Sequence, residues 1–250
     1  MDLNLLESRL FDVGRRPGKR RKAIGRKKVS QRVFDDSTLL TLYRLTNKRA
    51  FQYISGIVST GKEANVFHAV TEEGEELAIK IYSTLVDDFK RRGKYIRGDP
   101  RFKVGSSHRR LIYEWARKEY QNLKRVHGKV DCPRPIVVSN NVLVMSFIGE
   151  TGIPAPKLRE TKIKDPEKYF KKIISMIKKM HSLGIVHGDL SEYNILNPGK
   201  PLFIDFSQGV VLQHQHALEF LKRDIENICK YFSKYGIESD SGKIYASIVK

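Results

Sequence analysis

The sequence predicts an α+β protein with a β-rich first lobe, a mostly helical second lobe and a helical extension at its N-terminus. Two patterns support this prediction: short β-rich segments follow one another within residues 53–82, and amphipathic helical periods occupy residues 108–127 and 165–184. Between these helices, the sequence GETGIPAP at residues 149–156 breaks both patterns, as a linker between two lobes would. The expected parts are an extension over 1–50, a first lobe over 51–148 and a second lobe over 149–250.

The extension is expected to contain a short helix over Ser37–Asn47, because apolar residues at 39, 40, 42, 43 and 45 follow a Ser/Thr cap. A second helix is expected to begin at Lys48. The strands then follow as YISGIVST from Tyr53, NVFHAVTE from Asn65 and ELAIKIY from Glu76, and the acidic turn EEGEE joins the last two. These segments predict a meander of three antiparallel strands.

Residues 83–107 lack any long apolar period and carry seven cations, so we expect a basic loop that is mobile without a partner. The helix over residues 108–127 follows, and two further strands, PRPIVVS and NVLVMSFI, meet at an Asn-Asn turn. The helix has an apolar stripe that is expected to face the core: Leu111, Trp115, Tyr120 and Leu123.

The second lobe is expected to begin with a helix that is opened by Asp165-Pro166 and ends near Gly184. A loop with the sequence IVHGDLSEYNIL, a short strand PLFIDF and two helices over about 214–235 and 239–250 complete the chain. One face of the first of these helices is apolar: Tyr169, Phe170, Ile173, Ile174, Ile177 and Met180.

The composition indicates an intracellular protein. Of the 250 residues, 40% are hydrophobic, yet no run of about 18 apolar residues could span a membrane. Residues 1–10 alternate polar and apolar side chains without a signal-peptide core, so we expect a cytoplasmic protein. Cys132 and Cys229 lie far apart without the His or Cys neighbours of a zinc site, and we interpret both as reduced thiols.

The net charge of +19 points to a phosphate-rich partner, either nucleic acid or nucleotide. The cations are clustered: Arg15–Lys28 contains nine of them and no acid, and Lys90–Lys103 is a second basic segment. Neither segment has the aromatic density of a base-stacking platform, so contacts to RNA phosphates with little sequence specificity are expected. A lysine-rich solvated surface, as thermophiles carry, is the alternative interpretation.

The turn between the first two strands resembles a phosphate-binding loop. It reads STGKEANV from Ser59, with Gly61 and Lys62 at its centre. A kinase glycine-rich loop has the form G-x-G-x-x-G-x-V, and here Ser59 and Ala64 occupy the outer glycine positions. An ordinary hairpin turn explains the same residues, and the spacing is not that of a Walker A loop.

Lys80 lies within the strand ELAIKIY, where an unpaired buried cation would be costly. We therefore expect an acid from the following helix to pair with it while it also contacts phosphates, as in kinases. Glu114 and Glu119 are the candidates, and Glu119 is preferred because its neighbours Tyr120 and Leu123 are apolar. A cation on an edge strand is the simpler alternative.

The residues His187 to Asn194 match the pattern H-x-D-L-x-x-x-N, in which the Asp orients the acceptor hydroxyl and the Asn holds a metal ion. Eleven residues after Asn194, Asp205 ends the apolar sequence LFID, where a Mg²⁺-binding carboxylate belongs. An Asp at a strand end can simply cap a turn. The joint spacing of Lys80, Asp189, Asn194 and Asp205 instead predicts phosphoryl transfer from ATP.

Four strings, STGKEANVFHA, LAIKIY, HGDLSEYNIL and IDFSQGV, resemble the RIO family of atypical protein kinases, in particular its Rio-one type. The resemblance runs from about Arg20 to the C-terminus. It implies a reduced bilobal protein-kinase-like fold, ATP with Mg²⁺ or Mn²⁺ as cofactors, and serine kinase and ATPase activities in maturation of the small ribosomal subunit. Because the chain ends after the last helix, it resembles the archaeal form.

The resemblance also implies individual roles. Asp205 is expected to form a phospho-aspartate, Met145 to shape the back of the adenine pocket, and the backbones of Ser146 and Ile148 to pair with adenine. The sequence departs from ordinary kinases as this family does, with His-Gly-Asp for His-Arg-Asp, Asp-Phe-Ser for Asp-Phe-Gly, and no activation segment. Autophosphorylation is expected at two serines that adjoin a pair of arginines: Ser106 and Ser107.

Three functions remain open on the sequence alone. The first is a serine/threonine-protein kinase with an unassigned acceptor. The second is an ATP-gated assembly factor that binds pre-ribosomal RNA, in which protein phosphorylation is incidental, because no activation segment is present to position a peptide. The third is a small-molecule kinase such as an aminoglycoside or choline kinase, which the family-specific strings and the charge disfavour.

Overall fold

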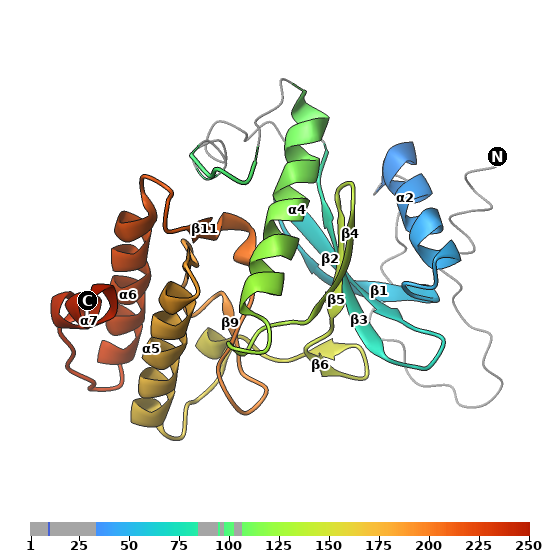
Figure 1. Cartoon of the computed structure of the whole chain (residues 1–250). Coiled ribbons are helices and arrows are strands. Elements are labelled where there is room, and N and C mark those ends of the chain that lie inside the picture. Colours follow the sequence, from blue (N-terminus) through green and yellow to red (C-terminus); the bar gives the residue numbers. More distant parts are fainter. Residues whose placement is uncertain (1–9, 11–33, 85–94, 96–97, 103–106) are drawn as a thin grey trace.

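In a computed structural model of the protein, an antiparallel sheet forms the first lobe (Figure 1). The structure describes Leu10, Tyr95 and residues 34–84, 98–102 and 107–250. Its strand order is β1-β2-β3-β5-β4, so the predicted meander of three strands is confirmed and the two later strands extend it. The pairing of β1 with β2 shifts register twice, between Ile54 and Gly56 and between Ile57 and Ser59. The five strands are β1 (Tyr53–Thr60), β2 (Ala64–Val70), β3 (Glu76–Tyr82), β4 (Pro135–Ser139) and β5 (Val142–Ser146).

Helices cover the two faces of this sheet, α2 (Asp36–Asn47) on one and α4 (His108–Val126) on the other (Figure 1). Because successive side chains of a strand point to opposite faces, Ile79 packs in the cluster with α2 while Lys80 faces α4. The strand β3 therefore has Leu77, Ile79 and Ile81 on one face and presents Lys80 to the other.

The beginning of the chain corrects two expectations. Asp35, not a serine or threonine, caps α2, because its carboxylate accepts a hydrogen bond of 2.8 Å from the Thr38 N–H. The second helix expected from Lys48 is absent from the described residues: Arg49 adopts a left-handed conformation with φ of 58°, and the chain turns directly into β1.

The buried face of α4 is wider and more polar than its sequence predicts. Trp115 and Leu123 are buried as expected, but Leu111 and Tyr120 are only partly buried. Three polar side chains are buried instead: Lys118, Glu119 and Asn122. They face the segment that follows Asp205, since α4 packs against that segment as well as against the sheet.

The second lobe is mainly helical, with α5 (Pro166–Ser182), α6 (Ala217–Ser233) and α7 (Ser241–Val249). Asp165 caps α5 as predicted, by accepting from the Lys168 N–H at 3.0 Å. The linker between the lobes is not irregular but forms a small hairpin of β6 (Gly149–Glu150) and β7 (Ile153–Pro154). None of the helices in the described ranges is long and apolar enough to cross a membrane.

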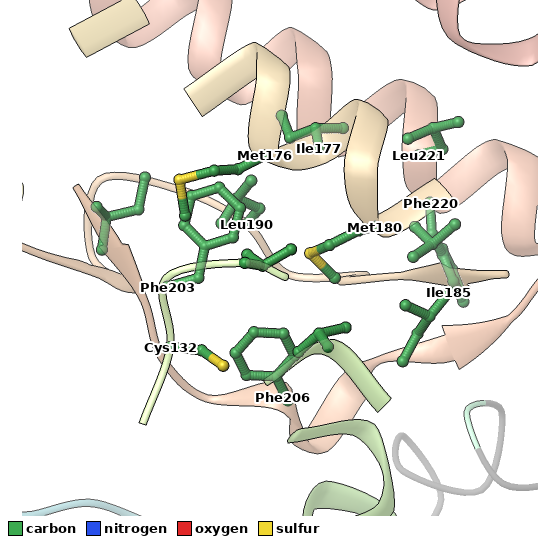
Figure 2. Close-up of a cluster of buried hydrophobic side chains, with 14 of the residues drawn as sticks. Cys132, Met176, Ile177, Met180, Ile185, Leu190, Phe203, Phe206, Phe220 and Leu221 are labelled. Atoms are coloured by element: carbon green, nitrogen blue, oxygen red, sulfur yellow. The ribbon is translucent and has the colours of Figure 1, made fainter. Parts of the chain in front are cut away.

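Short strands and 3₁₀ turns just before α5 and between α5 and α6 carry the segments of greatest chemical interest. Figure 2 shows Leu190 and Phe206 buried in the same hydrophobic cluster as Met176 and Met180 of α5. These apolar neighbours anchor the polar residues beside them in sequence. The short elements are η1 (Leu158–Glu160), β8 (Ile185–Val186), β9 (Ile195–Leu196), β10 (Leu202–Phe203), η2 (Phe206–Gln208) and β11 (Val210–Val211).

Candidate active site

Lys80 lies at the centre of a buried ion-pair cluster between the two lobes. Its ammonium nitrogen lies 2.9 Å from Oε2 of Glu119 and 2.9 Å from Oδ1 of Asp205. Glu114, the alternative partner, instead pairs with Arg117 at 3.9 Å. The structure therefore brings together Lys80, Glu119 and Asp205 as the sequence predicts, and Lys80 is not a cation on an edge strand, because β3 lies in the middle of the sheet.

Burial alone would lower the pKa of Lys80, but the neighbouring carboxylates of Asp205 and Glu119 raise it above its ordinary value. Lys80 therefore stays a cation. Burial raises the pKa of Glu119, and Lys80 together with the Tyr82 hydroxyl, which donates to Glu119, opposes this rise. The ammonium group is thus held between the carboxylates of Glu119 and Asp205.

Asp205 lies two residues beyond β10 and not at the end of a strand as expected. Its φ of 61° and ψ of 69° place it in the left-handed region, which a non-glycine residue occupies only when its surroundings enforce it. Its Oδ1 accepts from Lys80 and from the Ser207 hydroxyl at 2.7 Å, which leaves Oδ2 for another partner. Although burial acts to raise its pKa, Lys80 and Ser207 lower the pKa of Asp205 to about 2.

Asp189 and Asn194 lie on the same loop and contact each other. The Asn194 amide nitrogen donates to the Asp189 carbonyl at 2.8 Å and to Oδ2 of Asp189 at 3.2 Å. The Gln208 amide donates to the same Oδ2 at 3.1 Å, so both of these side-chain amides bind Oδ2 and neither binds Oδ1. Burial and the charge of Asp205 raise the pKa of Asp189 to about 6.

The loop is held from α6 by residues that sequence reasoning missed. Asp224 is buried and accepts from the N–H groups of Gly188 at 2.8 Å and Leu190 at 2.9 Å, and Arg223 donates to the Gly188 carbonyl. Gly188 has φ of +77°, and a Cβ there would lie 2.9 Å from the Gln208 carbonyl oxygen. This close approach explains the glycine of His-Gly-Asp. The signal available in the sequence was an acidic residue, Asp224, at an apolar position of the helical period of α6.

The residues present fit a hard divalent cation. Mg²⁺ prefers oxygen ligands and commonly combines one or two carboxylates with substrate phosphates. Asp205 Oδ2 is free of the contacts that occupy Oδ1, and Asn194 has its amide nitrogen engaged, so its carbonyl oxygen is available. No group of three His, Cys, Asp or Glu residues in the described part of the chain could hold a metal ion alone. The metal assignment of Asn194 and Asp205 stays a prediction, which requires phosphates to complete the shell.

The predicted nucleotide-binding residues lie at the turn between β1 and β2 and around the end of β5. Ser59, Gly61 and Lys62 are exposed, and the Gly61 N–H donates to the Ala64 carbonyl at 3.1 Å to close the hairpin. Met145 and Ser146 end β5. Their roles, and that of Ile148 beyond the strand, stay predictions.

The hydrogen bonds at the end of β5 refine the adenine prediction. The Ser146 N–H donates to the Arg134 carbonyl at 2.8 Å, and the Ile148 carbonyl accepts from Ala155 at 2.9 Å. Adenine would therefore meet the carbonyl of Ser146 and the N–H of Ile148. The Ser146 hydroxyl accepts from the Arg134 N–H, so this side chain faces the sheet and not a nucleotide.

Several predictions on the basic regions lie outside the described residues: the segment Arg15–Lys28, the mobility of most of 83–107, and Ser106. Ser107 is described, and it precedes α4 as an exposed N-cap without a side-chain cap bond. Its autophosphorylation stays a prediction.

Comparison with known proteins agrees with this geometry. The RIO domain model matches residues 65–244. The RIO-type serine/threonine-protein kinase Rio1 of Methanocaldococcus jannaschii is 45% identical over 235 residues, which cover 92% of this chain and 80% of that protein. The human serine/threonine-protein kinase RIO1 is 39% identical, with 83% of this chain and 38% of the human protein covered.

A solved structure of the Rio2 kinase from Chaetomium thermophilum, described as an ADP/Mg²⁺-phosphoaspartate complex, superposes with a TM-score of 0.68. At 23% identity, with 84% of this chain and 65% of that chain covered, this likeness shows the fold, and it confirms the reduced kinase-like architecture. The matched domain and the archaeal and human relatives show that the chain belongs to the RIO family of atypical serine/threonine-protein kinases, as a member of the Rio1 type.

Proposed function

We propose that this kinase transfers the γ-phosphoryl group of ATP through the site formed by Lys80, Asp189, Asn194 and Asp205. The observation that carries the proposal is the convergence of Lys80 from β3, Glu119 from α4 and Asp205 from the second lobe on one buried cluster. In this arrangement Lys80 contacts the phosphates while Glu119 holds its ammonium group in place. Asp205 and Asn194 would hold Mg²⁺ or Mn²⁺, which neutralises phosphate charge when bound.

Asp189 orients the acceptor. Its Oδ2 is held by Asn194 and Gln208, so Oδ1 accepts the proton of a serine or threonine hydroxyl as the oxygen bonds to the γ-phosphorus. The bond between that phosphorus and the bridging oxygen of ADP breaks, and ADP leaves. Such a reaction depends on positioning more than on covalent chemistry, which suits a site built from fixed hydrogen bonds.

We also propose an ATPase cycle through Asp205. The carboxylate Oδ2 attacks the γ-phosphorus, ADP leaves, and water then hydrolyses the aspartyl phosphate to regenerate the carboxylate. A pKa of about 2 keeps Asp205 ionised for this attack, and its side chain is 41% exposed. The related Rio2 structure is described as a phosphoaspartate complex, which supports the same chemistry here.

The experiment is to incubate the protein with γ-labelled ATP and Mg²⁺, quench in acid and measure bound phosphate. An aspartyl phosphate is stable at low pH and released by hydroxylamine, whereas phosphoserine resists hydroxylamine. We expect hydroxylamine-labile label in the wild type and none in Asp205→Asn. Hydroxylamine-labile label that persists in Asp205→Asn would contradict the assignment of Asp205 as acceptor.

The pKa of Asp189 predicts the acid limb of the pH profile. With a pKa of about 6, Asp189 is protonated at lower pH and cannot accept the hydroxyl proton. Thus kcat/KM for phosphorylation of a serine-containing acceptor should fall tenfold per pH unit below about pH 6. A thermal unfolding midpoint measured at each pH controls for loss of the fold. A profile that stays flat down to about pH 5 would exclude Asp189 as the base.

We propose maturation of the small ribosomal subunit as the cellular role, with ribosomal RNA as a partner. The Rio1-type family and the net charge of +19 support it. In this role the protein acts by protein phosphorylation, by ATP-gated RNA binding, or by both. The net positive charge specifically favours RNA contact.

RNA affinity should fall steeply with salt, with a log–log slope of several units, because bound phosphates release counterions. Neutralising the cations of Arg15–Lys28 should flatten this slope and leave basal ATP turnover unchanged. Filter binding to structured ribosomal RNA at a series of salt concentrations measures it, with Lys171→Ala as a matched control on an exposed helix face. RNA affinity that does not change with salt would show that the cations form only a solvated surface.

A further inference from the structure

A buried chain of polar contacts runs from the basic loop, through α4, to the turn that follows Asp205. It begins at Asp99, which is 2% exposed and binds the Arg101 guanidinium through both carboxylate oxygens, at 2.9 Å and 2.7 Å. Arg101 then donates from Nη1 to the Asn122 side-chain oxygen at 2.9 Å. Asp99 and Asn122 at the two ends of these contacts are buried, and the Arg101 side chain between them is 21% exposed.

Asn122 uses its amide group on the other side to hold η2. Its nitrogen donates to the carbonyl oxygens of Phe206 and Gly209, both at 2.8 Å. A Cβ at Gly209 would lie only 2.8 Å from this nitrogen, so the turn and the amide fit closely. Every hydrogen-bonding atom of the Asn122 side chain therefore has a partner, and the orientation of the amide is fixed by Arg101.

Two neighbours on α4 hold the same turn. Lys118, one helical turn before Asn122, donates to the Ser207 carbonyl at 2.9 Å, and Glu119 accepts from the Phe206 N–H at 3.2 Å. This turn, η2, adjoins both carboxylates of the proposed site, those of Asp205 and Asp189. It follows Asp205, which has an unfavourable left-handed backbone, and it carries Gln208, which contacts Asp189.

A left-handed aspartate persists only where surrounding contacts enforce it. The contacts from α4 supply that constraint, and Arg101 supplies the fixed orientation of Asn122. A bidentate arginine is suited to this task, because its planar fork sets direction as well as charge. In metal sites, loss of a residue that orients a ligand typically lowers metal affinity or activity about 10- to 100-fold.

We propose that Asp99, Arg101 and Asn122 are positioning residues for the metal-binding carboxylate of Asp205, which couples residues 98–102 of the basic loop to the active site. The inference rests on the proposed function of Asp205. It assigns to part of this loop a task in phosphoryl transfer that is independent of RNA binding or autophosphorylation.

The test measures ATP turnover against Mg²⁺ concentration in Arg101→Ala and in Asn122→Asp, which keeps the shape and the acceptor for Arg101 but loses both donors to η2. We expect the Mg²⁺ concentration for half-maximal turnover to rise about tenfold or more in each, with a fall in kcat of similar size. Binding of a fluorescent ATP analogue without metal should stay unchanged. Arg101→Lys keeps the charge without the fork, so it should recover little of the loss.

Arg117→Ala on the exposed side of α4 is the matched control for loss of an arginine, and it should behave as the wild type. Thermal unfolding midpoints give the folded fraction of each variant, and kcat is corrected for it. A network with only a structural role would lower the unfolding midpoint and leave the Mg²⁺ requirement of the folded fraction at its wild-type value. That result in Arg101→Lys and Asn122→Asp would overturn this inference and leave the proposed function standing. Asp205→Asn separates the two proposals: if it retains metal-dependent turnover, the proposed function fails and this inference fails with it.

Discussion

Replacing Asp189 with alanine is expected to lower the turnover of phosphorylation at least about 10²-fold while nucleotide affinity stays close to that of the wild type. The reason is geometric. Asp189 accepts hydrogen bonds from Asn194 and Gln208, so in the proposed mechanism its Oδ1 would face the acceptor, while the ion pairs of Lys80 are with Glu119 and Asp205. Its removal takes away the proton acceptor and leaves the phosphate-binding cation in place.

Single-turnover kinetics with saturating ATP measure this loss, and equilibrium titration with a fluorescent nucleotide measures binding separately. Asp165→Ala is a suitable control, because this exposed aspartate caps α5 in the same lobe. Turnover in Asp189→Ala that equals the wild type would remove Asp189 from the mechanism. Loss of nucleotide binding without loss of turnover at saturation would place it in the nucleotide pocket instead.

Replacing Lys80 with methionine is expected to affect stability and activity together. Glu119 is 1% exposed in its side chain, and it would lose the cation that offsets its buried charge. Removal of one partner from a buried ion pair typically costs about 3–5 kcal/mol in the free energy of unfolding. Turnover should fall about 10²- to 10³-fold, because no cation then meets the developing charge on the phosphates.

The double variant Lys80→Met/Glu119→Gln separates these effects. A neutral amide at 119 no longer needs a cation, so most of the lost stability should return while turnover stays low. Urea denaturation gives the free energy of unfolding, and an ATPase assay gives turnover. If Lys80→Met were as stable as the wild type, the buried pair would not have the energetic role inferred from its burial. If the double variant regained activity, Lys80 would not be a phosphate ligand.

The sequence predicted the residues whose spacing along the chain is diagnostic. Lys80, Asp189, Asn194 and Asp205 stand at characteristic separations, and the structure brings them together around one cluster or the loop beside it. Glu119 could be preferred over Glu114 because its neighbours Tyr120 and Leu123 are apolar. The strands and main helices were predictable for the same reason, since their periods of two and 3.6 residues are local properties.

The missed residues take their roles from tertiary contacts. Asn122 meets Phe206 across 84 positions of sequence, and Asp224 meets Gly188 across 36. The helical period can place such a side chain on a buried face, but no local pattern tells which distant backbone groups it will bind. The apolar stripe predicted for α4 suits a helix that packs against one surface, but α4 packs against both the sheet and η2. Its buried face therefore includes Lys118, which single-stripe reasoning would assign to solvent.

Within the described residues, β1 lies at the edge of the five-stranded sheet, and its two register shifts affect how readily a second chain could pair with that edge. A long, regular edge strand presents a row of unpaired backbone N–H and C=O groups to which a second chain can add a strand. The irregularities near Ile54 and Ser59 interrupt that row, because bulges increase the local twist. Ile57, which is 39% exposed, sits between them. The strand that leads into the β1–β2 turn is thus a poor template for the addition of a strand from a second chain.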